Sequence, residues 1–113
     1  MSLPRESELL RIYIGEQDRL DGRPLYERIL EEARNRGLAG ATVLRGVMGY
    51  GANSRQIQTF KIERLSEDLP VVVEIVDTEE NLEKFLDTVG PQIPAGLVTM
   101  EKAQVKFYRF EKK

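Results

Sequence analysis

The residues best suited to bind a ligand are three consecutive positions in which two glycines flank an aromatic residue, Gly49-Tyr50-Gly51. A glycine has no Cβ, so two glycines let backbone N–H groups come close to a bound molecule. Tyr50 would then cover a flat part of that molecule or shape the adjoining loop. The alternative is a tight turn that is anchored by its aromatic side chain. We take the three residues as a candidate ligand site.

Two arginines, Arg45 and Arg109, are candidates for neutralising an anion, because a guanidinium makes paired hydrogen bonds to phosphate. Arg109 lies in a basic segment: residues 101–113 contain five basic and two acidic residues, whereas residues 71–100 contain six acidic residues and one basic residue. The final segment is therefore suited to an anionic ligand. An ion pair with Glu74 inside an oligomer is the alternative for Arg45.

Several kinds of active site are excluded by composition, because the sequence contains no His, no Cys and no Trp. Disulfides, thiolate or imidazole metal sites, and His or Cys catalysis are absent for that reason. Glu74 is the one carboxylate that we expect to have a shifted pKa, since it lies inside the apolar run 71–76. An ion pair explains it more simply than catalysis, so we predict no catalytic residue.

No established metal or phosphate motif occurs either. Gly15-Glu16-Gln17-Asp18 with Asp21 lacks the spacing and the terminal Glu of a calcium loop, which favours a polar turn without a metal. The glycines match neither the dinucleotide fingerprint nor a phosphate loop with Gly-Lys-Ser or Gly-Lys-Thr.

The whole composition predicts one domain, residues 1–113, with flexible ends at 1–7 and 111–113. Seventeen basic and nineteen acidic residues give a net charge of −2, without the basic excess of a nucleic-acid binder. No segment has the signature of a signal peptide or a membrane span. We expect a cytoplasmic protein that neither inserts into a membrane nor binds nucleic acid.

Periodicity predicts the elements that position these residues. Alternating or β-rich segments predict strands at 8–16, 41–48, 71–76 and 96–110. Helical stripes predict one helix at 24–36 and a second from a cap at Asp77 or Thr78 to Gly90. Residues 52–69 lack clear periodicity and predict a long excursion with at most a short strand or helix inside it.

This order predicts a ferredoxin-like βαββαβ fold of the α+β class, an antiparallel four-stranded sheet in the order 4-1-3-2 with both helices on one face. Alternation places Arg11, Tyr13 and Glu74 on the other face. A face that mixes apolar and charged side chains is costly to leave in water or to bury without partners, so we expect an oligomer with paired Arg and Glu. The strand residues expected to face the helices are Leu10, Ile12, Ile14, Val73 and Ile75.

Taken in order, several segments of the chain resemble an uncharacterised branch of the PII-like signalling proteins. The resemblance covers residues 9–108 and is carried by the segments 14–16, 22–26, 40–51, 65–77 and 96–99. It implies a ferredoxin-like subunit that forms a homotrimer and binds adenine nucleotides in clefts between subunits. It also implies that the loop between the second and third strands, residues 52–68, docks on a membrane transporter or an enzyme.

The resemblance assigns particular residues to the nucleotide cleft. Thr42 matches a threonine on the second strand, Gly49-Tyr50-Gly51 a Gly-aromatic-Gly at the base of the loop, and Glu74 a Glu-Ile-Val on the third strand. Departures are also present: residues 93–97 contain no Lys, and an Arg pair near the chain end is reduced to Arg109. The loop lacks the tyrosine modification site and the His of relatives. A mono- or diphosphate is therefore easier to accommodate than a triphosphate.

Together these observations predict a regulatory protein that needs no cofactor and takes AMP, ADP or ATP as ligand. The ligand-binding candidates are Thr42, Arg45, Gly49, Tyr50, Gly51, Glu74 and Arg109. An enzyme that acts on a small anionic metabolite in the same cleft and a purely structural trimer are the two alternatives.

Overall fold

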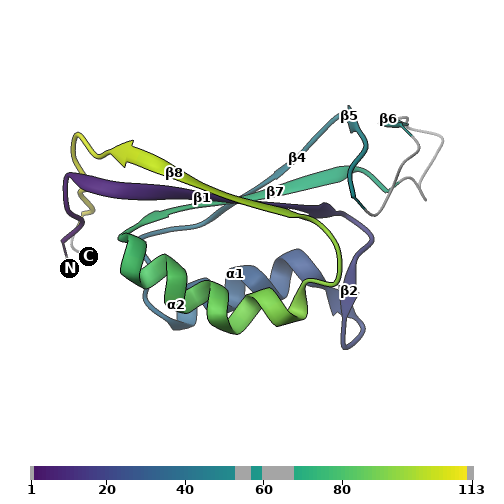
Figure 1. Ribbon diagram of the computed structural model, residues 1–113, viewed down its shortest axis with the longest axis horizontal. Helices are drawn as coiled ribbons and strands as arrows, with labels where there is room; N and C mark the ends of the chain where they lie inside the picture. The colour runs from purple at the N-terminus through teal and green to yellow at the C-terminus, as the bar shows by residue number, and fades with distance from the viewer. Residues whose placement is uncertain (1, 53–56, 60–67, 112–113) are drawn as a thin grey trace.

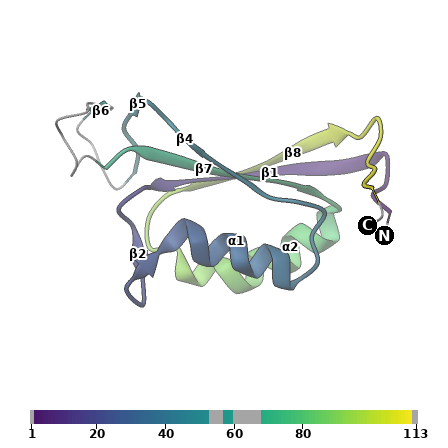
Figure 2. The same cartoon turned by 180° about the vertical axis from the view of Figure 1, so that it is seen from behind.

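The computed structural model describes residues 2–52, 57–59 and 68–111, and these form one antiparallel sheet with two helices packed on one of its faces (Figures 1 and 2). The sheet contains β1 (Glu6–Gly15), β4 (Thr42–Arg45), β7 (Pro70–Asp77) and β8 (Leu97–Gln104). The helices are α1 (Leu25–Asn35) and α2 (Glu79–Val89), the second of which ends in a 3-10 turn, Gly90–Gln92. The predicted ferredoxin-like βαββαβ fold is confirmed.

The strands lie in the order β4-β7-β1-β8, so β1 and β7 are central. This is the predicted order 4-1-3-2 read from the other edge. The register places Arg11 opposite Glu74 on β7 and opposite Thr99 on β8. The central position of β1 brings its C-terminal end beside the start of both neighbouring strands.

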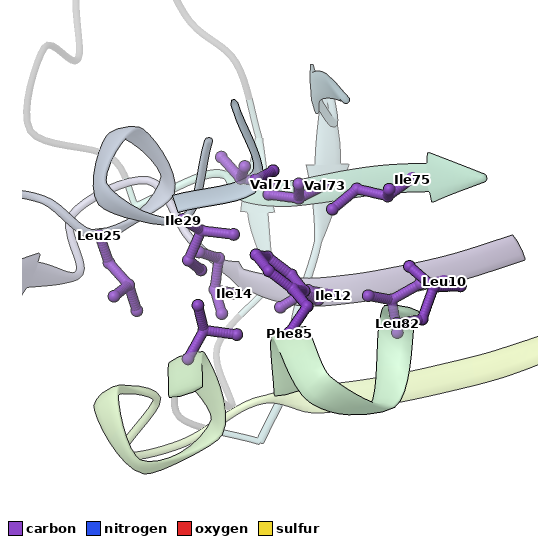
Figure 3. Close-up of a cluster of buried hydrophobic side chains, with 12 residues drawn as sticks. Leu10, Ile12, Ile14, Leu25, Ile29, Val71, Val73, Ile75, Leu82 and Phe85 are labelled. Atoms are coloured by element: carbon purple, nitrogen blue, oxygen red, sulfur yellow. The ribbon is translucent and has the colours of Figure 1, made fainter. Parts of the chain in front are cut away.

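The core lies between the sheet and the helices (Figure 3). Alternate residues of β1 and β7 face it, and each helix contributes residues spaced three or four apart, as a helical stripe requires. Full burial of one such side chain stabilises the fold by about 1.5–3 kcal/mol. The core side chains are Leu10, Ile12, Ile14, Leu25, Ile29, Ala33, Val71, Val73, Ile75, Leu82, Phe85 and Val89.

The start of α2 is held by two adjacent polar residues. Thr78 is the N-cap, and its hydroxyl accepts a hydrogen bond from Asn81 N at 3.1 Å. Asp77 is buried and accepts from Ala39 N at 2.8 Å, from Thr78 N at 2.7 Å and from Asn81 Nδ2 at 2.8 Å. One carboxyl group therefore joins the connection after α1 to the first turn of α2.

The other face of the sheet carries the predicted mixture of charged and apolar side chains. Arg11 donates from Nε to Glu74 at 3.0 Å and from Nη1 to Glu101 at 2.5 Å. The hydrogen bond to Glu74 raises the pKa of Arg11 above its ordinary value, and the hydrogen bond to Glu101 makes the second-largest contribution in the same direction. Tyr13 and Leu44 are among the exposed apolar side chains on this outer sheet face.

One end of the sheet, where β1 begins and β8 ends, differs from the expectations. Glu6 and Ser7 were expected to be flexible, but they pair with Gln104 and Ala103, and the Ser7 hydroxyl donates to Pro4 O at 2.8 Å. The last strand ends at Gln104 rather than at 110, because β1 offers no partner beyond Glu6. Val105 N then donates to Arg5 O at 2.8 Å, and the chain leaves the sheet.

The predicted strand 41–48 is interrupted. After β4 the chain turns, and β5 (Met48–Gly49) pairs with β6 (Gln58–Thr59) in a separate two-stranded sheet. Gly46 makes the turn possible, since a Cβ there would lie 2.8 Å from Pro70 Cγ. β6 is the short strand expected inside the 52–69 excursion. Residues 53–56 and 60–67 of that excursion lie outside the described part of the chain.

A small hairpin that the sequence was not predicted to form precedes α1. Strands β2 (Arg19–Leu20) and β3 (Arg23–Pro24) pair across Asp21 and Gly22. Both turn residues have positive φ, 54° and 79°, as the favoured two-residue hairpin turns require. Neither described helix is long and apolar enough to cross a membrane.

Candidate functional site

A cavity of about 510 Å³ lies where β1 ends and β8 begins, beside the β5 turn. This end of the sheet is opposite the end that holds both chain termini (Figure 1). The cavity wall consists of residues 13–15, 49–52 and 95–97 together with Asp18, Asp68 and Pro70. Five separate parts of the chain thus meet in one place.

Two glycines allow the walls to approach one another. A Cβ on Gly96 would lie 2.6 Å from Tyr13 O, and Gly96 has a φ of 154°, which other residues rarely adopt. A Cβ on Gly49 would lie 3.1 Å from Pro70 Cγ. Close packing therefore requires a glycine at position 96, and at position 49 it leaves little room for a side chain.

Two carboxylates are fixed in the wall by backbone donors. Asp18 Oδ2 accepts from Gly15 N at 2.9 Å, and Asp68 Oδ1 accepts from Gln17 N at 2.8 Å. Glu16 N, between these donors, donates to Leu69 O at 2.8 Å. The chain after β1 is thereby tied to the residues that precede β7.

The charged side chains in the described cavity wall are acidic. The part of the chain that the structure describes contributes two Asp residues to the wall and no Lys or Arg. Arg45 donates to Glu16 at 2.8 Å, and Glu16 directly follows the lining residue Gly15. The described wall alone thus supplies no cation for a phosphate.

Three of the seven predicted site residues, Gly49, Tyr50 and Gly51, line the cavity. Tyr50 is 56% exposed and keeps much of its surface for contact. Apart from its two chain neighbours, no described residue has an atom within 4 Å of a hypothetical Cβ on Gly51. Close approach of a ligand to the backbone of these glycines stays a prediction.

The other four predicted site residues lie outside the cavity wall. Thr42 and Glu74 are paired in register on the outer sheet face, where Glu74 binds Arg11. Arg45 pairs with Glu16 rather than with Glu74. Arg109 lies over the ring of Phe107 at 4.2 Å, in the segment that follows β8 at the opposite end of the sheet. Within one chain, none of these four residues lines the cavity with the other three.

The sequence did not identify Asp18 and Asp68 as site residues. Asp18 was placed in a polar turn because its spacing fitted no metal loop, and Asp68 is separated from it by 50 positions. One usable signal was that each follows or precedes a predicted strand at the same end of the sheet. Within the described residues, no three Asp or Glu side chains are grouped to hold a metal ion.

The cavity also contains both ends of the predicted 52–68 loop. Ala52 and Asp68 line it, directly beside Tyr50 and Pro70. A molecule in the cavity would therefore touch the two points at which the loop leaves and rejoins the fold. The role predicted for the loop itself falls on residues most of which are outside the described ranges.

Comparison with known proteins places this arrangement in a family. The model of the DUF190 family, described as "Uncharacterized ACR", matches residues 7–105. The chain belongs to the DUF190 family. A UPF0166 protein of Aquifex aeolicus is 42% identical over 100 residues, which cover 88% of this chain and 93% of the relative. A UPF0166 protein of Methanocaldococcus jannaschii is 41% identical over 81 residues, 72% and 73% of the two chains.

Two solved structures that are similar to this DUF190 chain are PII-like proteins. One is CPII of Thiomonas intermedia, a nitrogen regulatory PII-like protein bound to ADP, AMP and bicarbonate, with a TM-score of 0.67, 17% identity and 88% of each chain covered. Another is a protein of Thermus thermophilus designated PII-like, with a TM-score of 0.63, 18% identity, and 88% and 89% covered. The DUF190 chain therefore has the fold of the PII-like proteins, as its sequence predicted.

Proposed function

We propose that this DUF190 protein is a PII-like regulatory protein that binds an adenine nucleotide, or a similar small anion, in clefts between the subunits of a homotrimer. Ligand binding would act on the 52–68 loop and so alter which partner, a membrane transporter or an enzyme of the cytoplasm, the protein engages. The proposal includes no catalytic step.

One observation carries the proposal: a cavity large enough for a nucleoside lies at the base of the loop and includes both of its ends. A ligand that contacts Tyr50, Ala52 and Asp68 has different contacts when the loop ends move. Such differential contact is what allows a ligand to shift a conformational equilibrium. The ADP and AMP bound to CPII, which shares the fold, further support an adenine nucleotide.

The position of the cavity supports a cleft between subunits. Tyr13 and Leu97 are opposite each other in the β1–β8 register, and both belong to the cavity wall and to the outer sheet face. The cavity therefore borders the face that we expect a second subunit to cover. In this arrangement the neighbouring subunit supplies the groups that one chain lacks there, with Arg109 for phosphate and Thr42 and Glu74 for further hydrogen bonds.

Calorimetric titration with AMP, ADP and ATP tests the proposal. We expect binding of at least one of them, and Tyr50→Ala should weaken it about tenfold because the ring is lost from the wall. Stacking of a base on an aromatic side chain is worth about 1–3 kcal/mol. Arg109→Ala should weaken ADP binding while leaving adenosine binding unchanged.

Leu30→Ala is the matched control, since Leu30 is an exposed apolar residue on α1, away from the cavity. It should bind as the wild type does. Absence of binding by all three nucleotides at millimolar concentration would overturn the proposed function. Binding that Tyr50→Ala leaves unchanged would place the nucleotide elsewhere.

A further inference from the structure

Asp18 and Asp68 each use only one carboxylate oxygen in hydrogen bonds to other described residues. Each directs one oxygen to a backbone N–H, at 2.9 Å from Gly15 N and at 2.8 Å from Gln17 N. Among the described residues, no hydrogen bond is made to the second oxygen of either carboxylate, and both residues line the cavity. An ionised carboxylate only accepts hydrogen bonds, so each can hold a ligand group that donates one.

We propose that Asp18 and Asp68 hold the nucleoside part of the ligand through its hydrogen-bond donors and so direct its phosphates out of the cavity. The donors are the ribose hydroxyls or the exocyclic amine of the base, which share this chemistry. The inference rests on the proposed function, and it assigns to two residues the choice of which end of the nucleotide enters.

The position of Asp68 depends on Gly15. A Cβ at position 15 would lie 2.7 Å from Asp68 Oδ1 and 2.8 Å from Asp68 Oδ2, so the carboxylate occupies the space that a side chain would fill. The Asp18 carboxylate binds the N–H of the same glycine. Both carboxylates are thus gathered around one backbone position, and the cavity presents them from adjoining points.

The charge and surface type of the wall that this chain forms disfavour the phosphate end beside Asp18 and Asp68. The described wall contains these two acidic side chains and no basic one, so a phosphate beside them would be repelled. The remaining wall includes Tyr13, Tyr50 and Leu97, whose exposed surfaces suit a flat base. Acceptors beside apolar walls match a nucleoside.

Conversion of either Asp to Asn tests the inference with little disturbance of the fold. The amide oxygen of Asn can still accept from the backbone N–H, whereas the other position becomes a donor and no longer accepts. Asp21→Asn is the matched control: it removes the same charge three residues after Asp18, at an exposed turn residue outside the cavity wall whose positive φ suits Asn.

The measurement is calorimetric titration of adenosine and ADP into the assembled wild type and into each of the three variants. Asp68→Asn and Asp18→Asn should each weaken adenosine and ADP by the same factor, about tenfold, because the lost hydrogen bond is to the part that the two ligands share. Asp21→Asn should change neither by more than about twofold, since it alters charge alone.

Two modified ligands identify the donor. Either 2′,3′-dideoxyadenosine, which lacks the hydroxyls, or N6,N6-dimethyladenosine, which lacks the amine donors, should bind wild type about tenfold more weakly than adenosine. The modified ligand that binds wild type more weakly should bind Asp68→Asn or Asp18→Asn with the same affinity as wild type. The hydrogen bond that the substitution removes is already absent from that ligand.

Three outcomes would overturn the inference. Unchanged adenosine binding by both Asp18→Asn and Asp68→Asn would show that these carboxylates make no hydrogen bond to the nucleoside. Tighter ADP binding with unchanged adenosine binding means that the carboxylates face the phosphates. Equal affinity of adenosine and both modified ligands would show that neither the ribose hydroxyls nor the exocyclic amine donates a hydrogen bond to the carboxylates. If the wild type binds neither adenosine nor any adenine nucleotide, the proposed function fails and this inference with it.

Discussion

At some positions of the cavity wall, the residue type is limited by the space that a side chain would need. Gly96 is the clearest case, since a Cβ would lie 2.6 Å from a backbone oxygen, which cannot rotate away. We predict that Gly96→Ala lowers the free energy of unfolding by about 1–3 kcal/mol. Urea denaturation measures this. Gly40→Ala, where nothing lies within 4 Å of the Cβ, should stay within about 0.5 kcal/mol of wild type; equal effects would refute the contact.

Glu31 gives a pH-dependent prediction. Arg23 lies 2.6 Å from it, and this hydrogen bond is the main reason why the pKa of Glu31 is below its ordinary value of 4.5. A lowered folded-state pKa stabilises the protein above the unfolded value, and the contribution is lost as the pH falls through the folded value. Glu31→Gln should therefore be slightly less stable than wild type at pH 7, and this difference should be smaller at about pH 3.

Unfolding of the two proteins at both pH values is the measurement. Glu83→Gln, on the exposed side of α2 and without an ion-pair partner among the described residues, should show no such convergence. A stability difference between Glu31→Gln and wild type that grows in acid would contradict the assignment.

The hydrogen bonds of Asp77 determine how two elements are joined. Its side chain is 2% exposed and accepts from the connection after α1 and from the start of α2. Asp77→Ala leaves three donors without this partner, so we predict a loss of about 2–4 kcal/mol in the free energy of unfolding. Asp87→Ala, on the exposed side of the same helix, should cost much less. If Asp77→Ala and Asp87→Ala lowered the free energy of unfolding equally, the hydrogen bonds of Asp77 would not stabilise the junction of the two elements. Thermal or urea unfolding measures both losses.

The elements themselves were predictable because their signals are local. Alternation at Leu10, Ile12 and Ile14 predicted β1 and its buried face, and Thr78 followed by acidic residues predicted the start of α2. Strand ends were less predictable, because the length of β8 depends on how far β1 extends. No local signal reports a partner's length.

The candidate site was predictable only where its residues are adjacent in sequence. Gly49-Tyr50-Gly51 forms a visible motif and lines the cavity. Asp18 and Asp68 are brought together by the antiparallel arrangement of β1 and β7, which the sequence predicts only for whole strands. The pairing of Arg45 with Glu16 depends on how the chain turns after β4, and no pattern specified that turn.

At the scale of the whole molecule, the outer sheet face is the feature that the proposed trimer would cover. It exposes Leu44 at 48% and Tyr13 at 37%, beside the Arg11 ion pairs. Light scattering should give three times the 12.9 kDa chain mass at micromolar concentration. Leu44→Lys should shift the protein toward monomer, because burial of an unpaired charge is costly.

Leu30→Lys is the control for that measurement, since Leu30 is also exposed, at 37%, but lies on α1. It should remain a trimer. A wild-type mass of one chain, or equal behaviour of the two variants, would contradict assembly through the outer sheet face.

The most direct test of the central claim is to map where ADP binds by the shifts of backbone amide resonances in the assembled protein. We predict that the largest changes fall at residues 13–15, 49–52 and 95–97, with smaller ones at Thr42 and Glu74 from the neighbouring subunit. Such a map would place the nucleotide at the base of the 52–68 loop. Changes confined to the exposed faces of α1 and α2, with none around the cavity, would contradict the account.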